Sequence, residues 1–362
     1  MTEEPAFSVH VHNQSQALNF FTSHNVSLVV SSYKDNRVYS FGATDNGKIS
    51  CWPSLHDRPM ALASMNGNVW LAGQHHLIRC APVGPEYNDD ENGKFTTTYV
   101  PRQLFALGDQ DIHGIYPSND PNKPYFVATK FSALCQLDPT KPTVTNNVVW
   151  KPPFITEIRP EDRCHLNDVC FIDGVPRYAS CVCESDAHDG WRDHRQEGGV
   201  IVDVQTGENY ATGLSMPHSP RWYKNQLWLL NSGTGELGVI NEGKFEAKVF
   251  LPGFLRGLAF VGRFAIVGSS LDRHEKRFQD LDLGKKLETK KTSPICGLYI
   301  VDLASFSITS KIELCGKMVH ELYDVCVVPG KRARVMGLND VDTKTMFVVQ
   351  EPEAKKEIDE QE

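Results

Sequence analysis

Residues 164–174 read CHLNDVCFIDG, a histidine followed by a strand-like run and a turn, and this stretch decides the fold because it recurs along the chain. His113 lies in DIHGIY, His218 in MPHSPRW and His320 in MVHELYDV, so the steps between the four histidines are 52, 53 and 102 residues. The same strand and turn without the histidine occur in RPMALASMNGNVWLAG and FLRGLAFVGRFAIVGSS. Six copies with a period near 52 residues therefore cover most of the chain.

Short strands separated by turns dominate the rest of the sequence. Runs such as SLVVSSY, NVWLAG, PYFVATKF, QLWLLNS and GLYIVDL are rich in β-branched and aromatic residues and are bounded by Gly, Asn, Asp or Pro. An even repeat of about 50 residues is typical of the four-stranded blades of a β-propeller. We therefore predict an all-β chain, a β-propeller with six blades, or seven as the alternative, whose ring is closed by N- and C-terminal strands.

The expected domain boundaries follow from this repeat. Residues 1–25 form an N-terminal arm or short helix, best placed at residues 14–23, and residues 26–350 form a single propeller domain. The final stretch, 351–362, is charged and without hydrophobic periodicity, which predicts a disordered tail. Two further segments, 185–198 and 272–295, interrupt the repeat and are expected to be long loops over a mouth of the ring.

Composition and charge exclude several classes of protein. The net charge of −8 argues against a nucleic-acid partner, because phosphate affinity depends on clustered Lys and Arg. The first residues lack the pattern of a secretory signal, and nowhere does the sequence approach the ~20 apolar residues that cross a bilayer. We expect no membrane association, a cytoplasmic location, and scattered cysteines that stay reduced. The oligomeric state is left open.

The repeated histidines predict a site at the centre of the ring. The innermost strand of each blade lines the channel, so residues at equivalent repeat positions converge from different blades. Imidazole nitrogens suit transition metals, and we predict that His113, His165, His218 and His320 hold Fe, Cu, Mn or Zn. A carboxylate from Glu321 in place of His320 is the variant of this prediction.

Other polar residues fall at the same repeat position and are candidates for catalysis. Arg221 and Arg256 suit a substrate carboxylate or phosphate, because the guanidinium fork binds such groups in a bidentate manner. Asp168 and Glu321 lie next to the histidines and are candidates to orient ligands or move protons. For both arginines, a salt bridge between blades is the structural alternative. Trp191 and Arg192 are placed to cover the mouth from the loop at 185–198.

The segments EDRCHLND, GLSMPHSPRWYKNQLWLLNSGTGELG, FLRGLAFVG and ELYDVCVVPG, with DIHG upstream, resemble the motifs of a mostly bacterial family of a domain of unknown function. The resemblance runs from SLVVSSY to ELYDVCVVPG and implies no activity. It places on the family's motif positions His113, His165, His218, Ser219, Pro220, Arg221, Trp222, Arg256, Gly257, Glu321 and Asp324. In that pattern another polar residue often replaces His320, which favours three histidines with Glu321. A weaker likeness of fold links the chain to gluconolactonase and paraoxonase propellers, whose calcium is held by oxygen ligands instead of histidines.

Three hypotheses for function remain at this point. The first is a metal-dependent enzyme acting on a small anionic or hydroxylated substrate, as a hydrolase, lyase or oxygenase. The second is a non-catalytic propeller that binds a protein or ligand on one face. The third uses the same histidines as acids and bases without a metal.

Overall fold

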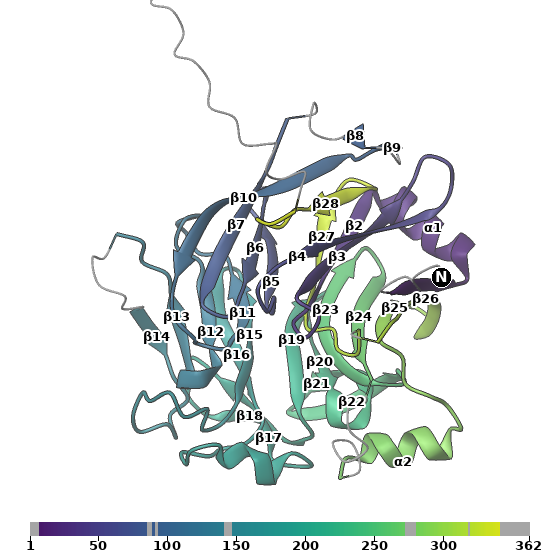
Figure 1. Cartoon of the computed structure of the whole chain (residues 1–362). Helices are drawn as coiled ribbons and strands as arrows, with labels where there is room; N and C mark the ends of the chain where they lie inside the picture. Colours follow the sequence, from purple (N-terminus) through teal and green to yellow (C-terminus); the bar gives the residue numbers. More distant parts are fainter. Residues whose placement is uncertain are drawn as a thin grey trace, which may run out of the picture.

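Six β-sheets surround a central axis in the computed structural model, which describes residues 7–84, 89–90, 93–140, 147–271, 280–317 and 319–340 (Figure 1). The innermost strands are β5 (Leu62–Met65), β11 (Ile112–Tyr116), β15 (Leu166–Ile172), β19 (Pro217–Tyr223), β23 (Phe254–Val261) and β27 (Val325–Pro329). Each innermost strand contacts the next one around the ring, and β27 contacts β5. The contacts form a closed circle, which confirms the β-propeller and settles its number of blades as six.

Three blades are simple four-stranded antiparallel meanders. Their remaining strands are β12 (Tyr125–Ala128), β13 (Ala133–Gln136) and β14 (Asn147–Trp150); β16 (Val175–Cys181), β17 (Gly199–Asp203) and β18 (Asn209–Leu214); and β20 (Gln226–Asn231), β21 (Glu236–Asn241) and β22 (Lys244–Phe250). Short 3-10 helices occupy Thr129–Phe131, Gly190–His194 and Ser232–Thr234.

Two blades have a fifth strand supplied from far away in the sequence. In one, β5 is followed by β6 (Asn68–Ala72), β7 (His76–Pro82) and β10 (Thr97–Ala106), and β28 (Ala333–Val335) adds in parallel to β10. A small hairpin of β8 (Asp89–Asp90) and β9 (Gly93–Lys94) lies between β7 and β10 in sequence. In the other, β23 is followed by β24 (Phe264–Ser270), β25 (Gly297–Asp302) and β26 (Ser307–Cys315), and β1 (Ser8–His12) pairs with β26.

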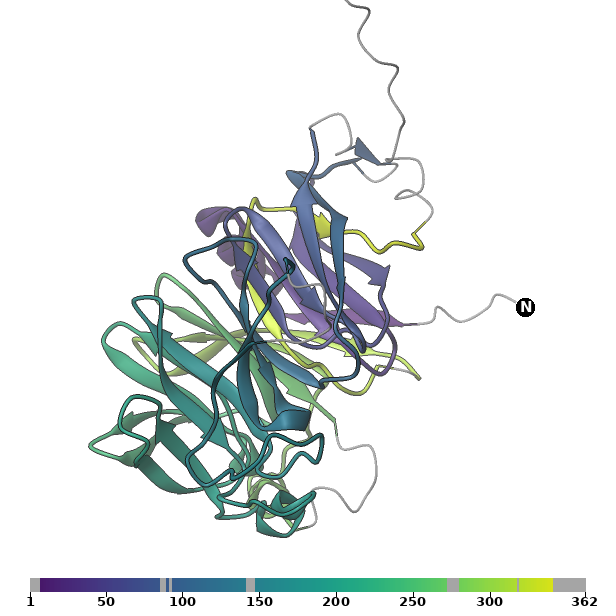
Figure 2. The same cartoon turned by 90° about the vertical axis from the view of Figure 1, so that its left-hand side faces the viewer.

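The sixth blade closes the ring and joins both ends of the described chain. Its innermost strand, β27, comes from the C-terminal part, whereas β2 (Val26–Ser32), β3 (Arg37–Ala43) and β4 (Ile49–Leu55) come from the N-terminal part. The register pairs Val29 with Cys326 and Leu28 with Val327. The predicted closure by N- and C-terminal strands is therefore confirmed, and the purple and yellow strands lie side by side in both views (Figure 2).

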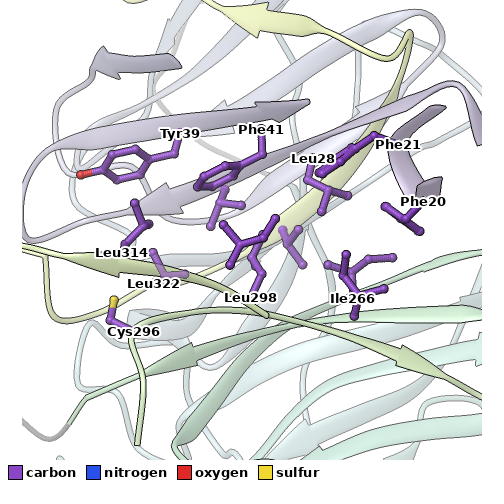
Figure 3. Close-up of a cluster of buried hydrophobic side chains, with 14 of the residues drawn as sticks. Phe20, Phe21, Leu28, Tyr39, Phe41, Ile266, Cys296, Leu298, Leu314 and Leu322 are labelled. Atoms are coloured by element: carbon purple, nitrogen blue, oxygen red, sulfur yellow. The ribbon is translucent and has the colours of Figure 1, made fainter. Parts of the chain in front are cut away.

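Apolar side chains fill the spaces between adjacent blades. The core between the closing blade and the fifth blade, which contains β23 to β26, is one example. Leu28 and Phe41 pack there against Ile266 and Leu298, and Phe21 of helix α1 (Gln14–His24) covers one end of this core (Figure 3). Central strands are buried on both faces, as in all six residues of β25, whereas outer strands such as β22 are half-exposed. This packing explains why the inner strands have continuous apolar runs.

The insertions and termini complete the molecule. The segment expected to be a loop at 272–295 contains helix α2 (Asp282–Thr289), and residues 272–279 lie outside the described residues. The predicted tail at 351–362 also lies outside them. Within the described part of the chain, no helix has the length and apolar character needed to span a bilayer.

Candidate functional site at one mouth of the channel

The innermost strands β11 and β15 begin with an irregular register. The register of β11 with β12 shifts between Ile112 and Gly114, so His113 stands out of the ladder as a bulge. The same shift between Leu166 and Asp168 places Asn167, not His165, at the position equivalent to His113. His165 precedes β15 and adopts a left-handed backbone conformation with φ of 48°. Such bulges change the direction of a side chain and are common beside functional sites.

His113 and His165 lie next to each other at this mouth. Their ring centroids are 5.0 Å apart and the planes are perpendicular. Nδ1 of His113 donates to the carbonyl of Asp111 at 2.7 Å, and Nδ1 of His165 donates to the carboxylate of Asp162 at 2.9 Å. Because each Nδ1 carries the proton, the lone pair of each neutral ring is on Nε2.

His218 interacts electrostatically with His113 and His165 and shares their hydrogen-bonding pattern. Its Nδ1 donates to the carbonyl of Met216 at 2.8 Å, and Ser232 Oγ lies 3.1 Å from the same nitrogen. Burial lowers the pKa of His218 well below its usual range, and the positive charge of Arg256 acts in the same direction. Burial also lowers the pKa of His113 to about 4. Both rings are therefore neutral at pH 7. We call His113, His165 and His218 the three-histidine mouth.

Arg256 borders this mouth as part of a buried ionic cluster. Its Nη1 donates to Glu321 at 3.1 Å, and Tyr33 donates its hydroxyl hydrogen to the same carboxylate. The guanidinium stacks over Phe254 at 4.8 Å and over Tyr323 at 5.9 Å. Tyr323 also contacts the ring of His113, with the centroids 5.2 Å apart. The predicted residues Arg256 and Glu321 are thus brought together beside the histidines.

Arg221 and Asp168 form a second pair, linked to Asp324. Nη1 of Arg221 donates to Asp168 at 2.7 Å, while Asp324 accepts from the backbone N–H groups of Leu62 and Val325. Burial raises the pKa of Asp168 to about 6, the Arg221 guanidinium opposes this rise, and the charge of Asp324 adds to it. The four predicted catalytic residues therefore form two separate ion pairs.

The segment at 185–198 covers His165. The ring of Trp191 lies 4.3 Å from that of His165, and its indole N–H donates to Asp162 at 2.8 Å. One carboxylate oxygen of Asp162 thus accepts hydrogen bonds from both side chains. The sequence reasoning did not include Asp162, although it is only three residues before His165, because a lone Asp in a loop carries no signal of its own.

Three buried polar atoms around this mouth have no hydrogen-bond partner among the described residues: Asp162 Oδ1, Asn167 Nδ2 and Arg256 Nε. Buried polar atoms are rarely left without partners in native proteins. Asn167 and Arg256 thus contribute donors, and Asp162 an acceptor, without a hydrogen-bond partner among the described residues.

His320 is not part of the three-histidine mouth. Its Nε2 donates to the carbonyl of Lys317 at 2.7 Å, so its tautomer is the opposite of the one that the other three histidines share. Across the described residues, no group of three or more His, Cys, Asp and Glu side chains has spacing ready to hold a metal ion.

The closed circle of innermost strands defines a class: a six-bladed β-propeller. The chain belongs to the family of the domain of unknown function DUF4915, whose model matches residues 15–336, which confirms the family resemblance. No curated protein matches the sequence.

Solved structures show the fold at low identity. A chain from the nidogen/laminin complex is 12% identical, with a TM-score of 0.50, over 83% of this chain and 98% of that one. A protein of unknown function from Bacteroides caccae is 9% identical, with a TM-score of 0.49, over 84% and 99%. The β-propeller domain of Cps50 (Swd1) from Myceliophteria thermophila is 11% identical, with a TM-score of 0.39, over 82% and 88%. Likeness at this level concerns the fold alone.

Proposed function

We propose that the chain is an enzyme whose reaction centre is the three-histidine mouth, with a transition metal held by Nε2 of His113, His165 and His218. The observation that carries this proposal is the common tautomer of the three rings, each with Nδ1–H donated to a carbonyl or carboxylate. Metal-ligating histidines almost always donate their other N–H in this way, which fixes the tautomer and the orientation of the ring. Burial keeps the rings of His113 and His218 neutral at pH 7, so protons do not compete with a metal for these two nitrogens.

The donor set fits iron, copper, manganese or zinc, which accept neutral nitrogen ligands. The present spacing of the rings is not that of a loaded site, so the proposal requires the imidazoles to draw together on binding. A bound metal would supply Lewis acidity or, for iron or copper, oxygen activation. The chain itself would bind a small anionic or hydroxylated substrate through Arg256 Nε and Asn167 Nδ2, which lack partners, and exclude water with Trp191.

Two other features are consistent with this proposal. Cys164 and Cys181 are buried thiols in contact with each other and form no disulfide, which supports a reducing, cytoplasmic location. The net charge of −8 supports a small-molecule substrate over a nucleic acid.

Elemental analysis of protein purified without a metal-loading tag tests the proposal. The wild type is expected to hold about one equivalent of metal, as three-ligand sites do, and the double variant His165→Ala/His218→Ala is expected to lose it. His320→Ala is the matched control and should keep the metal, because its imidazole is bonded to Lys317 outside the mouth. Circular dichroism shows whether the double variant folds, and His165→Gln/His218→Gln replaces it if it does not.

The proposal is overturned if the wild type binds none of the four metals after anaerobic reconstitution, or if His320→Ala loses metal as the double variant does. A metal-free result would leave two candidate functions, acid–base catalysis by the histidines and ligand binding without catalysis. Acid–base chemistry is favoured by the Asp162–His165 pair, in which the carboxylate accepts the Nδ1 hydrogen and leaves the lone pair on Nε2. Titration of the His165 ring by NMR, compared between wild type and Asp162→Asn, separates this from a purely binding propeller.

A further inference from the structure

A second cavity lies at the opposite mouth of the channel. Its volume is about 390 Å³, within the range of small-molecule sites, and its walls come from all six innermost strands. On β11, β15, β19 and β23 the lining residues lie further along the strand than the residue at the histidine mouth, as Tyr116 follows His113 and Phe171 follows Asn167. The cavity is therefore separate from the site of the proposed function, and ligand binding in it does not depend on that function.

Two stacked aromatic pairs contribute to its walls. Tyr223 and Phe260 lie parallel, with centroids 4.3 Å apart and an angle of 5° between the rings. Tyr116 and Phe171 are stacked at 4.5 Å and 23° on the neighbouring blades. Trp222 joins the lining and is 40% exposed, so its indole is available to a ligand. Flat aromatic surfaces from different blades favour a planar aromatic ligand.

Arg221 is the only formally charged residue that lines this cavity in the described part of the chain. Its Nη1 is bonded to Asp168 and to the carbonyl of Pro220, which holds the guanidinium in place. Within the described residues its Nε and Nη2 make no hydrogen bond, and 27% of its side chain is exposed. The carboxylates of Asp168 and Asp324 both interact with Arg221 but do not line the cavity, so the guanidinium is the charged group that a ligand contacts there.

We propose that this cavity binds a small planar aromatic ligand with one anionic group, the anion on the Arg221 guanidinium and the ring against Trp222 and the stacked pairs. The guanidinium offers a fork of donors that matches a carboxylate. A cationic aromatic would be repelled by the same group at short range. The aromatic walls account for the ring and Arg221 for the charge, so neither feature alone specifies the ligand.

Calorimetric titration of the full chain with 1-naphthoate tests this proposal, with phenyltrimethylammonium as the probe of opposite charge. We expect naphthoate to bind and Trp222→Ala to weaken it about tenfold, the equivalent of about 1.4 kcal/mol. Arg221→Lys keeps the charge but loses the planar fork, and it should weaken binding by a similar factor. Phe306→Ala removes an aromatic ring of comparable exposure on the fifth blade, and its affinity should equal that of the wild type.

A further variant separates the two mouths. His165→Ala should leave naphthoate binding unchanged if the ligand occupies the opposite mouth, whatever its effect on metal content. The proposal is overturned by absence of naphthoate binding, by tighter binding of the ammonium probe, by equal affinities of Trp222→Ala and wild type, or by loss of binding in His165→Ala. The dispersion of chemical shifts in NMR spectra shows whether Trp222→Ala and Arg221→Lys are folded before titration.

Discussion

At the residue scale, the sequence period located the histidines but not their exact structural equivalence. Counting 52 residues from His113 leads to His165, whereas the strand register makes Asn167 its equivalent. A β-bulge adds a residue without leaving a mark in composition, so spacing alone cannot resolve a shift of two positions. His320 matched the period yet is bonded to Lys317, because the chain before β27 is an irregular segment instead of a repeat. Asp162 could be found only from its contacts with His165 and Trp191.

The lowered pKa of His113 predicts how the free energy of unfolding depends on pH. Its pKa is lowered by burial to about 4, while the unfolded chain has the ordinary value near 6.5, so below pH 6.5 the unfolded chain binds a proton that the folded chain refuses. Stability from this residue is therefore present above about pH 6.5 and lost as the pH falls towards 4. The difference in unfolding free energy between wild type and His113→Gln should shrink by about 2 kcal/mol from pH 7 to pH 4.5.

Urea unfolding at the two pH values measures this difference. Asn167→Ala is the control, since it changes a buried, non-titrating residue at the equivalent position, and its cost should be the same at both pH values. An equal cost of His113→Gln at pH 7 and pH 4.5 would show that the ring is not held neutral.

At the element scale, the middle strands of the blades could be predicted from the sequence, whereas the strands at the outer edges could not. Runs such as GLYIVDL and QLWLLNS are buried on both faces, which makes them apolar and β-branched or aromatic. By contrast, β1 and β28 pair with strands about 300 and 230 residues away, through the register partners Ser8 and Cys315 and Thr97 and Ala333. These edge strands form only on a sheet that is already assembled, so their local sequence does not predict their pairing. Helix α2 is short and lies in a charged insertion, where the polar sequence indicated a loop.

The close contact between two inner strands predicts the effect of one substitution. Gly257 has φ of +75°, and an added Cβ would lie 2.7 Å from the backbone nitrogen of Val325 and 2.8 Å from the Cα of Asp324. Gly47 has a similar φ of +74° but no atom within 4 Å of its added Cβ. Both alanine variants carry the cost of a left-handed backbone, about 1 kcal/mol, whereas only Gly257→Ala adds a clash with β27.

We therefore expect Gly257→Ala to destabilise the chain by about 2 kcal/mol more than Gly47→Ala, the usual cost of forcing extra volume into a packed region. Chemical denaturation of both variants at pH 7 gives the difference. Equal costs would mean that β23 and β27 can separate without loss, and that the contact at Asp324 is not part of what holds the fifth and sixth blades together.

At the scale of the whole molecule, the ring is a closed circle only because strands from the two ends of the chain meet in one sheet. Closure removes exposed strand edges at the axis and places residues from all six blades around one channel. The period of 52 residues is consistent with this arrangement, in which the strands before the first copy join a C-terminal strand, and a seventh blade is the alternative from the sequence. The two mouths of the channel follow from the same geometry, one lined by histidines and the other by Arg221 and aromatic rings.

A covalent link across the closing sheet tests how much stability the closure supplies. Val29 faces Cys326 in the antiparallel register, and both are buried in the same apolar cluster, so Val29→Cys places two thiols at positions that a disulfide can join. Oxidation would close nearly the whole chain into a loop, and the loss of unfolded-state entropy predicts stabilisation of up to about 5 kcal/mol.

Mass spectrometry of tryptic peptides verifies the 29–326 bond, and thermal unfolding is compared between oxidised and reduced protein. The double variant Val29→Cys/Cys326→Ser keeps the change in packing but cannot form the bond, so its melting temperature should not respond to oxidant. If oxidised Val29→Cys carries the bond but melts at the same temperature as the reduced form, the blades separate before the closing sheet opens, and unfolding begins elsewhere in the ring.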